Sequence, residues 1–231
     1  MIAPDCIGYG LTPGRGSQDY PNGAQGEFLL KFIRALGIKK AAVGGNSNGG
    51  WLCQYLAHEA PDVVTHCIII NSLNGTRPVP PEPEGLRYIY GPAGHANEDP
   101  TEDRIREQLL RLYFHKQIVT EQRVKRSLEI ASLNAQFMRA RAIATSSTVH
   151  DANKNLEYRG RHMSEWAGEL KAPVLMTWSR ENTGSTPEQA LAFFNRIRDV
   201  VMPVFIDAGH HLMTEHPERW SQVVASFVKN K

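Results

Sequence analysis

Residues 41–51 read AAVGGNSNGGW, a short apolar run that breaks into small residues around Ser47. A strand that reverses into a helix within a few residues leaves no room for Cβ atoms beside the turn, so we expect the bend to require Gly45 and Gly49. Ser47 then lies at the apex of the turn. The following helix begins with the N–H of Asn48, and the positive N-terminal end of this helix faces the serine hydroxyl. The G-x-S-x-G pattern therefore predicts a nucleophile elbow, although an ordinary Gly/Ser turn after a strand also matches it.

Spacing argues against two phosphate-binding motifs at this stretch. A dinucleotide-binding G-x-G-x-x-G needs glycines at its first, third and sixth places, and no frame through residues 44–50 provides them. A P-loop needs a lysine after its last glycine, where this chain has Trp51.

Length and composition limit the class of protein. The chain has 231 residues, 41% hydrophobic and 22% charged, which fits one large domain or a domain with a subdomain. A net charge of +2 gives no electrostatic reason to bind nucleic acid. Cys6, Cys53 and Cys67 show no C-x-x-C spacing, so we expect reduced thiols. No apolar run approaches a membrane span and no signal peptide is recognisable, so the expected compartment is the cytoplasm.

Strand and helix patterns alternate along both ends of the chain. An amphipathic helix over 24–36 precedes a strand over 39–44, a helix over 49–60 and a buried strand over 64–70. The sheet pattern then returns over 172–178 and 202–206, and a helix over 217–229 closes the chain. This alternation predicts the α/β class, with a mostly parallel sheet and helices on both faces.

A helical insert separates the two sheet-forming parts. Prolines at 78–83 make a stiff linker, and three helical patterns follow, the last over 137–143. We therefore predict a core of residues 1–78 and 155–231 with a helical cap, or lid, over 79–154, inserted after the strand that follows the nucleophile helix. The alternative is an ordinary helical subdomain that plays no part in access.

A serine hydroxyl becomes a good nucleophile only when a base takes its proton. His210 is the strongest candidate, because it lies just past the last strand, and reactive groups of α/β sheets gather at the carboxyl ends of strands. Gly209 leaves the backbone free to aim the ring inward. A metal site formed by His210, His211 and His216 is disfavoured, since no H-E-x-x-H or carboxylate-bearing pattern surrounds them.

Four groups of residues carry a family resemblance: Ala3-Pro4-Asp5 with Gly8-Tyr9-Gly10, residues 45–50, Pro173-Val174-Leu175 with Trp178, and Gly209-His210. In these motifs the chain resembles the α/β-hydrolases, and within that fold the meta-cleavage-product hydrolases, which cleave C–C bonds. The resemblance implies that Asn46 helps to hold the acidic end of the substrate. It further implies that water cleaves a dienol-keto acid after ketonisation, with no cofactor.

The resemblance also locates the third member of a catalytic triad, and there the chain departs from the family. The family's aspartate comes four residues after the tryptophan, a position held here by Asn182 and flanked by Glu181. An asparagine accepts the imidazole N–H but does not stabilise an imidazolium, and a comparable change in a serine protease costs about 10⁴ in turnover. Either Glu181 takes the role or catalysis is slow.

Two further family positions differ and leave the substrate class open. The family's lid arginine, which binds the substrate carboxylate, falls at Ser127, one residue beyond Arg126. The tryptophan that follows the family's histidine is His211 here.

The start of the chain differs as well. The fold begins with three strands and a His-Gly loop that supplies one oxyanion N–H, whereas this sequence opens at Met1–Asp5, which resembles the end of the fourth strand. We therefore expect N-terminal strands to be missing. Asn48 would then be the remaining oxyanion donor, and losing the other costs about 3–4 kcal/mol at the transition state. Sheet edges exposed in this way favour pairing with another chain, as in a homodimer.

Two hypotheses follow from the sequence. The first is a serine-dependent hydrolase of small molecules that cleaves a C–C bond next to carbonyls or a carboxylic ester. Ser47 is its nucleophile, His210 its base, and Asn182 or Glu181 orients the base, with no cofactor or metal. The second is a weak or inactive remnant of the fold that serves as a binding or interaction module.

Overall fold

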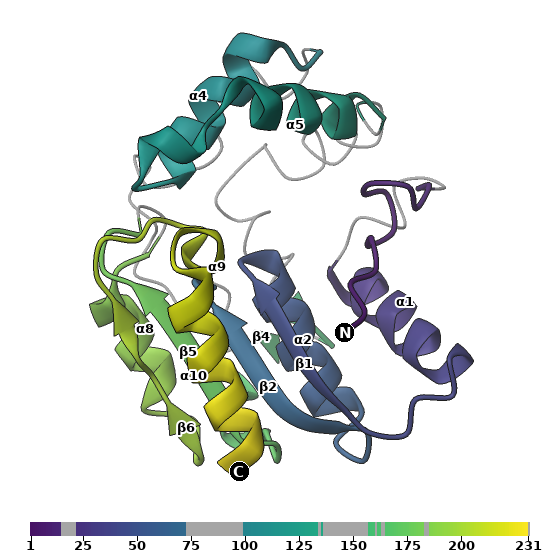
Figure 1. The fold of residues 1–231 in the computed structure, drawn as a ribbon. Helices are drawn as coiled ribbons and strands as arrows, with labels where there is room; N and C mark the ends of the chain where they lie inside the picture. The colour runs from purple at the N-terminus through teal and green to yellow at the C-terminus, as the bar shows by residue number, and fades with distance from the viewer. Residues whose placement is uncertain are drawn as a thin grey trace.

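The computed structural model describes residues 1–14, 22–72, 99–133, 135, 157–159, 161–162, 165–182 and 185–230. The central sheet consists of β1 (Ala41–Asn46), β2 (Val64–Ile70), β5 (Val174–Ser179), β6 (Val200–Val201) and β7 (Val204–Phe205). The order is β1-β2-β5-β6, β7 also pairs with β5, and all these pairings are parallel. Their carboxyl ends therefore meet at one edge of the sheet, at the top of Figure 1, where parallel sheets bind ligands.

Helices cover both faces of this sheet (Figure 1). They are α1 (Asn22–Ala35), α2 (Asn48–Glu59), α8 (Pro187–Phe194), α9 (Leu212–Glu215) and α10 (Pro217–Asn230). One core lies against α1, α2 and α8 and contains Cys67 and Ile69 of β2. The other lies against α9 and α10 and contains Ile68 and Ile70. Because successive side chains of a strand point to opposite faces, the second half of β2, from Cys67 to Ile70, is apolar and buried on both sides. The predicted α/β class is confirmed.

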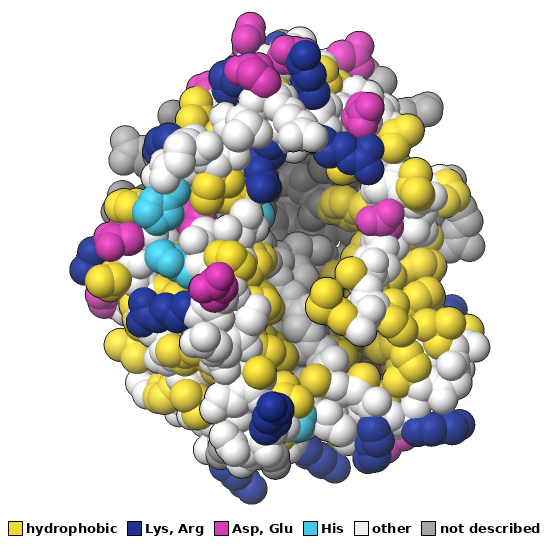
Figure 2. Space-filling view, viewed as in Figure 1, with side chains coloured by type: hydrophobic (Ala, Val, Ile, Leu, Met, Phe, Trp, Pro, Cys, Tyr) yellow, Lys and Arg dark blue, Asp and Glu magenta, His cyan; other side chains and the backbone are white. Residues whose placement is uncertain are grey.

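A helical layer lies beyond the carboxyl edge of the sheet (Figure 1). It contains α4 (Glu102–Leu112), the short 3₁₀ helix η4 (Lys116–Ile118) and α5 (Glu121–Leu133). Charged side chains gather at the outer side of this layer (Figure 2). Arg106 of α4 and Glu121 of α5 form an ion pair of 2.6 Å. The third predicted helix lies outside the described residues, so the cap boundaries of 79–154 stay a prediction. None of the described helices is both long and apolar enough to cross a membrane.

The first residues do not form the strand that Met1–Asp5 was expected to end. Residues 1–5 are exposed and belong to no strand. A strand is stable only where a neighbour satisfies its backbone hydrogen bonds, and among the described strands β1 pairs with β2 alone. Turns hold the segment instead. Asp5 accepts the N–H of Leu11 at 2.9 Å, and the buried Gln25 of α1 donates to the carbonyl of Ile7 at 2.9 Å.

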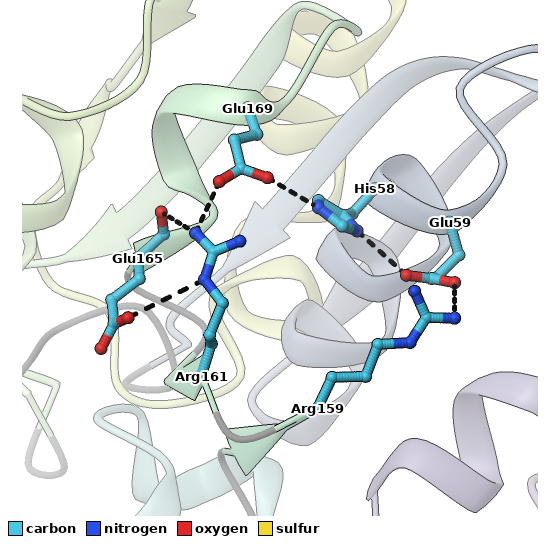
Figure 3. A network of polar contacts seen from close by, with 6 residues as sticks. All are labelled: His58, Glu59, Arg159, Arg161, Glu165 and Glu169. Carbon is cyan, nitrogen blue, oxygen red and sulfur yellow. Dashed lines mark hydrogen bonds and ion pairs between the residues drawn. The ribbon is translucent and has the colours of Figure 1, made fainter.

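A charged network ties a small antiparallel sheet to the end of α2 (Figure 3). This sheet consists of β3 (Glu157–Tyr158) and β4 (Arg161–His162), and it precedes the 3₁₀ helix η6 (Ala167–Glu169). Arg159 donates to Glu59 at 3.0 Å, and Arg161 donates to Glu169 at 2.5 Å. His58 lies between the two carboxylates, 3.1 Å from Glu59 and 3.0 Å from Glu169. The network lies at the opposite end of α2 from Ser47.

Candidate active site

Ser47 occupies the turn between β1 and α2 in a backbone conformation that residues with a side chain rarely adopt. Its φ is 54° and its ψ is −118°. Its N–H donates to the carbonyl of Ile70 at the end of β2, and its carbonyl accepts the N–H of Gly50, both at 2.9 Å. Such a conformation costs about 1–3 kcal/mol and persists only where the surroundings fix it, often at functional sites. The strand–turn–helix predicted from G-x-S-x-G is therefore present, with Ser47 at its apex.

Two glycines make the turn possible, and they differ in part from the expected pair. A Cβ on Gly45 would lie 2.3 Å from the backbone carbon of Gly49, and one on Gly50 would lie 2.5 Å from Cβ of Ser72. A Cβ on Gly49 would meet nothing within 4 Å. The expectation for Gly45 is confirmed, and the one for Gly49 is wrong. The Gly49 backbone lies close to Gly45, but its own side-chain position is open.

His210 lies at the same edge of the sheet and is held there through its backbone. It is 5% exposed and follows β7. Its N–H donates to the carbonyl of Leu112 at the end of α4 (2.7 Å), and its carbonyl accepts from the side-chain amide of Asn46 (3.0 Å). Since Asn46 directly precedes Ser47, the loop that carries the histidine is hydrogen-bonded to the elbow that carries the serine.

The imidazole of His210 contacts the side chain of Asn182. Nδ1 of His210 lies 2.9 Å from Oδ1 of Asn182, which is itself 4% exposed. Nδ2 of Asn182 donates to Oγ of Ser185 at 2.9 Å, and the indole N–H of Trp178 donates to the carbonyl of Ser185 at 3.1 Å. These bonds orient the amide with its oxygen toward the ring. Nδ1 must then carry the proton, so Nε2 keeps the lone pair that a general base needs.

Glu181 has other partners. Its carboxylate accepts from Nε of Arg180 at 2.6 Å and from the N–H of Ala208 at 3.3 Å. Burial alone would raise the pKa of Glu181, but the Ala208 N–H and the Arg180 charge together lower it. Of the two residues considered for orienting His210, the structure therefore brings Asn182 to the ring and directs Glu181 to Arg180 and the Ala208 backbone.

Both histidines of the loop are held neutral. Burial, and to a lesser degree the charge of His211, lower the pKa of His210 to about 3. Burial and the charge of Arg123 likewise lower the pKa of His211 to about 4. The neutral amide of Asn182 supplies no charge that would offset these effects. His210 is therefore unprotonated near pH 7, and the same low pKa makes its ring a weaker base than an ordinary histidine.

Asn46 links the elbow to the histidine loop. One side-chain N–H donates to the carbonyl of Ile70 at 3.1 Å and the other to the carbonyl of His210 at 3.0 Å. A primary amide has two N–H groups, so its oxygen is the polar atom left, and an oxygen repels a carboxylate. These two bonds fix Asn46 between the elbow and the histidine loop, and the substrate-binding role that the resemblance implied for it stays a prediction.

The helical layer contributes Tyr113 and Arg123 beside the histidines. Arg123 of α5 donates to the hydroxyl of Tyr113 at 3.1 Å, and its guanidinium lies 5.5 Å from the centre of that ring. The Tyr113 ring lies 5.2 Å from the His211 ring. Arg126, by contrast, is exposed and pairs with Glu129 at 2.8 Å. Arg123 is thus the helical-layer cation that acts on His211.

Two further expectations from the sequence concern an oxyanion donor and a metal. In an elbow of this kind the N–H of the residue after the nucleophile serves as an oxyanion donor. Asn48, the first residue of α2, holds that position, and its oxyanion role stays a prediction. Within the described part of the chain, no group of three or more His, Cys, Asp or Glu side chains could hold a metal ion.

The fold family follows from a family comparison. A family model described as alpha/beta hydrolase fold matches residues 1–217. The chain belongs to this family. As an α/β-hydrolase it has its elbow, then the strand before Asn182, then its histidine loop, which is the chain order of this fold. The resemblance noted in the sequence is confirmed.

Several hydrolases of low sequence identity match almost the whole chain. A 2-hydroxy-6-oxononadienedioate/2-hydroxy-6-oxononatrienedioate hydrolase of Paraburkholderia phymatum is 22% identical over 99% of this chain and 76% of its own. A 2-hydroxymuconate semialdehyde hydrolase of Pseudomonas putida is 24% identical with the same coverage. A meta-cleavage product hydrolase of Pseudomonas fluorescens superimposes with a TM-score of 0.82 at 22% identity, over 98% of this chain and 78% of that one.

The sequence did not reveal Asn71, which hydrogen-bonds the histidine loop of this α/β-hydrolase to the end of β5. Asn71 is 1% exposed and directly follows β2. Its amide N–H groups lie 2.9 Å from Oγ of Ser179, 3.2 Å from the carbonyl of Gly209 and 3.1 Å from that of His210. Its oxygen accepts the N–H of Ser179 at 2.8 Å. Its place at the end of a buried strand was the signal that could have revealed it.

Proposed function

We propose that the protein is a cofactor-independent serine hydrolase in which Ser47 is the nucleophile and His210 the base. The observation that carries the proposal is the 2.9 Å contact between Nδ1 of His210 and Oδ1 of Asn182. It leaves Nε2 of a neutral ring free to take a proton, in a loop that Asn46 ties to the elbow.

The proposed reaction begins when Oγ of Ser47 attacks a carbonyl carbon while Nε2 of His210 takes the hydroxyl proton. The N–H of Asn48 stabilises the negative oxygen that forms. The intermediate collapses as the bond to the leaving group breaks, and the imidazolium gives its proton to that group. Water, deprotonated by His210, then attacks the acyl-serine and releases a carboxylic acid together with Ser47.

The proposed substrates are small molecules of two classes, keto acids cleaved at a C–C bond and carboxylic esters. One relative is named as a dienedioate/trienedioate hydrolase and another as a semialdehyde hydrolase, which favours the first class. For that class, ketonisation of the dienol must come first, because a carbon leaves readily only when an adjacent carbonyl delocalises its electrons. In the ester class the leaving group is an alkoxide, which takes the same proton. We further propose that the enzyme works in the cytoplasm, where Cys53 and Cys67 would stay the buried thiols seen here, and that it forms a homodimer.

A fluorophosphonate probe tests the nucleophile directly. Labelling of the wild-type chain that disappears in Ser47→Ala and falls strongly in His210→Ala is the expected result. Steady-state rates with 2-hydroxymuconate semialdehyde and with p-nitrophenyl butyrate then decide between the C–C and the ester class. Labelling that persists in Ser47→Ala would overturn the assignment.

One observation favours a second candidate function. The residue that orients His210 is an uncharged Asn182, which leaves the developing imidazolium without a counter-charge. A chain of this kind could bind small molecules in the same place without turning them over. A folded wild-type chain that fails to react with the probe at any pH between 6 and 9 would support this binding module.

A further inference from the structure

Glu215 joins three backbone N–H groups from two distant parts of the chain. One carboxylate oxygen accepts from Phe114 at 2.5 Å and from His115 at 2.9 Å, in the segment that follows α4. The other oxygen accepts from Gly209 at 2.5 Å, immediately before His210. Hydrogen bonds to a charged group are roughly twice as strong as neutral ones, so this carboxylate is a strong link between the two segments.

The two segments also touch each other directly. The N–H of His210 donates to the carbonyl of Leu112 at 2.7 Å. A Cβ on Gly209 would lie 2.5 Å from that same carbonyl oxygen and 2.7 Å from the nitrogen of Phe114. The backbone after α4 thus packs directly against the histidine loop, and the Glu215 carboxylate, from α9, hydrogen-bonds to both segments.

We propose that Glu215 is a positioning residue that couples the placement of α4 to the placement of His210. The inference rests on the proposed function, since it gives the position of the base a catalytic meaning. A shift of the backbone at 112–115 cannot occur without moving Gly209 or breaking bonds to Glu215. The helical layer over the sheet edge therefore controls where the imidazole stands relative to Ser47.

The substitution Glu215→Gln tests this coupling. The amide keeps one acceptor oxygen but directs an N–H group toward backbone donors that Glu215 now satisfies. A misplacement of about 1 Å can cost on the order of 100-fold in rate, so we expect the fluorophosphonate labelling rate constant of Ser47 to fall by roughly 10- to 100-fold. The kcat for p-nitrophenyl butyrate per titrated site should fall similarly, while KM changes by less than about 3-fold.

A second readout does not depend on activity. Hydrogen exchange followed by mass spectrometry should show faster exchange in both segments, 112–115 and 208–210, in Glu215→Gln. The matched control is Glu218→Gln in the first turn of α10, an exposed glutamate that should change neither rate nor exchange. If Glu215→Gln folds poorly, Gly209→Ala is the second test. Its Cβ forces the two backbones apart while the Glu215 carboxylate is kept, so it should lower the labelling rate and speed exchange in the same way.

The outcomes separate the proposals. An unchanged labelling rate per folded molecule in both variants would overturn the positioning role, even with faster exchange. Unchanged exchange in both segments would show that Glu215 does not link them. A wild-type chain that does not label would overturn the proposed function and with it the positioning role, while the exchange result would still report on the link itself.

Discussion

The side-chain oxygen of Asn182 lies 2.9 Å from Nδ1 of His210, where a carboxylate would stabilise the imidazolium formed during catalysis. We predict that Asn182→Asp raises kcat by at least about 10-fold, since the opposite change in a serine protease costs about 10⁴. The hydroxyl of Ser185 can rotate to donate to the new carboxylate, so that hydrogen bond is kept. The measurement is kcat for p-nitrophenyl butyrate per site titrated with fluorophosphonate.

The control for this prediction is Glu181→Gln. Because Glu181 contacts Arg180 and Ala208, its substitution should leave kcat within about 3-fold of the wild-type value. A lower kcat in folded Asn182→Asp, or a large loss in Glu181→Gln, would contradict the arrangement of His210 and its partner.

The low pKa values of His210 and His211 predict that the free energy of unfolding decreases as the pH falls below about 6.5. Both pKa values, about 3 and about 4, lie below the ordinary histidine value of about 6.5, so the unfolded chain binds more protons. The stability they provide is fully present above about pH 6.5. It falls with pH by up to about 1.4 kcal/mol per pH unit for each histidine, until pH reaches the folded value.

Urea unfolding between pH 7.5 and pH 4.5 measures this slope. The variant His211→Gln, which cannot take up a proton on unfolding, should show a shallower slope than the wild type. An identical slope would mean that His211 does not remain neutral in the folded chain. The labelling rate of Ser47 should also persist below pH 6.5, because His210 stays unprotonated there.

The sequence predicted those parts of the site that depend on local pattern. The turn at Ser47 follows from glycine spacing, and the buried strand 64–70 follows from composition. The nearness of Asn182 to the histidine followed only through the family resemblance. Each of these features is set by residues close together in the chain or by a motif of fixed spacing.

The contacts that hold His210 could not be predicted in this way. Asn71 and Glu215 reach the loop of Gly209 from a strand end and from a short helix, and Leu112 reaches it from α4. No spacing rule connects such residues, since their meeting depends on how whole layers pack. The prediction that the turn requires a glycine at position 49 was wrong for a related reason. The sequence showed which glycines flank the turn, but the atoms that crowd each one come from elsewhere in the fold.

The glycines of the elbow make a matched series. Gly45→Ala and Gly50→Ala place a Cβ 2.3 Å and 2.5 Å from neighbouring atoms, so each should lower the free energy of unfolding by about 2 kcal/mol or more. Gly49→Ala meets open space and should be neutral or slightly stabilising. Thermal or urea unfolding of the three variants provides the test. A destabilised Gly49→Ala beside an unaffected Gly50→Ala would restore the pair expected from the sequence.

Asn71 should matter for both stability and rate. Asn71→Ala leaves the buried N–H of Ser179 and the Gly209 and His210 carbonyls without this partner, and it puts alanine at a φ of 43°. We expect a loss of about 2–4 kcal/mol of unfolding free energy and a lower labelling rate of Ser47 per folded molecule. Ser179→Ala, which removes one hydroxyl acceptor, should cost about 1 kcal/mol and leave the rate nearly unchanged. Equal effects of the two variants would argue against a clamp at Asn71.

The charged network around His58 should stabilise the fold in a salt-dependent way and leave the rate of the proposed reaction unchanged. Hydrogen bonds from Arg161, and then from His58, lower the pKa of Glu169 to about 2, so its contribution is present above the ordinary carboxyl pKa and is lost as pH falls toward 2. Because these groups are partly exposed, Glu169→Gln should cost no more than about 1 kcal/mol at low salt and less at high salt.

The matched control is Glu129→Gln, which removes an isolated exposed pair with Arg126 and should have almost no effect. Urea unfolding at low and high ionic strength compares the two variants, and equal, salt-independent values would mean that the six residues of Figure 3 act as separate surface pairs.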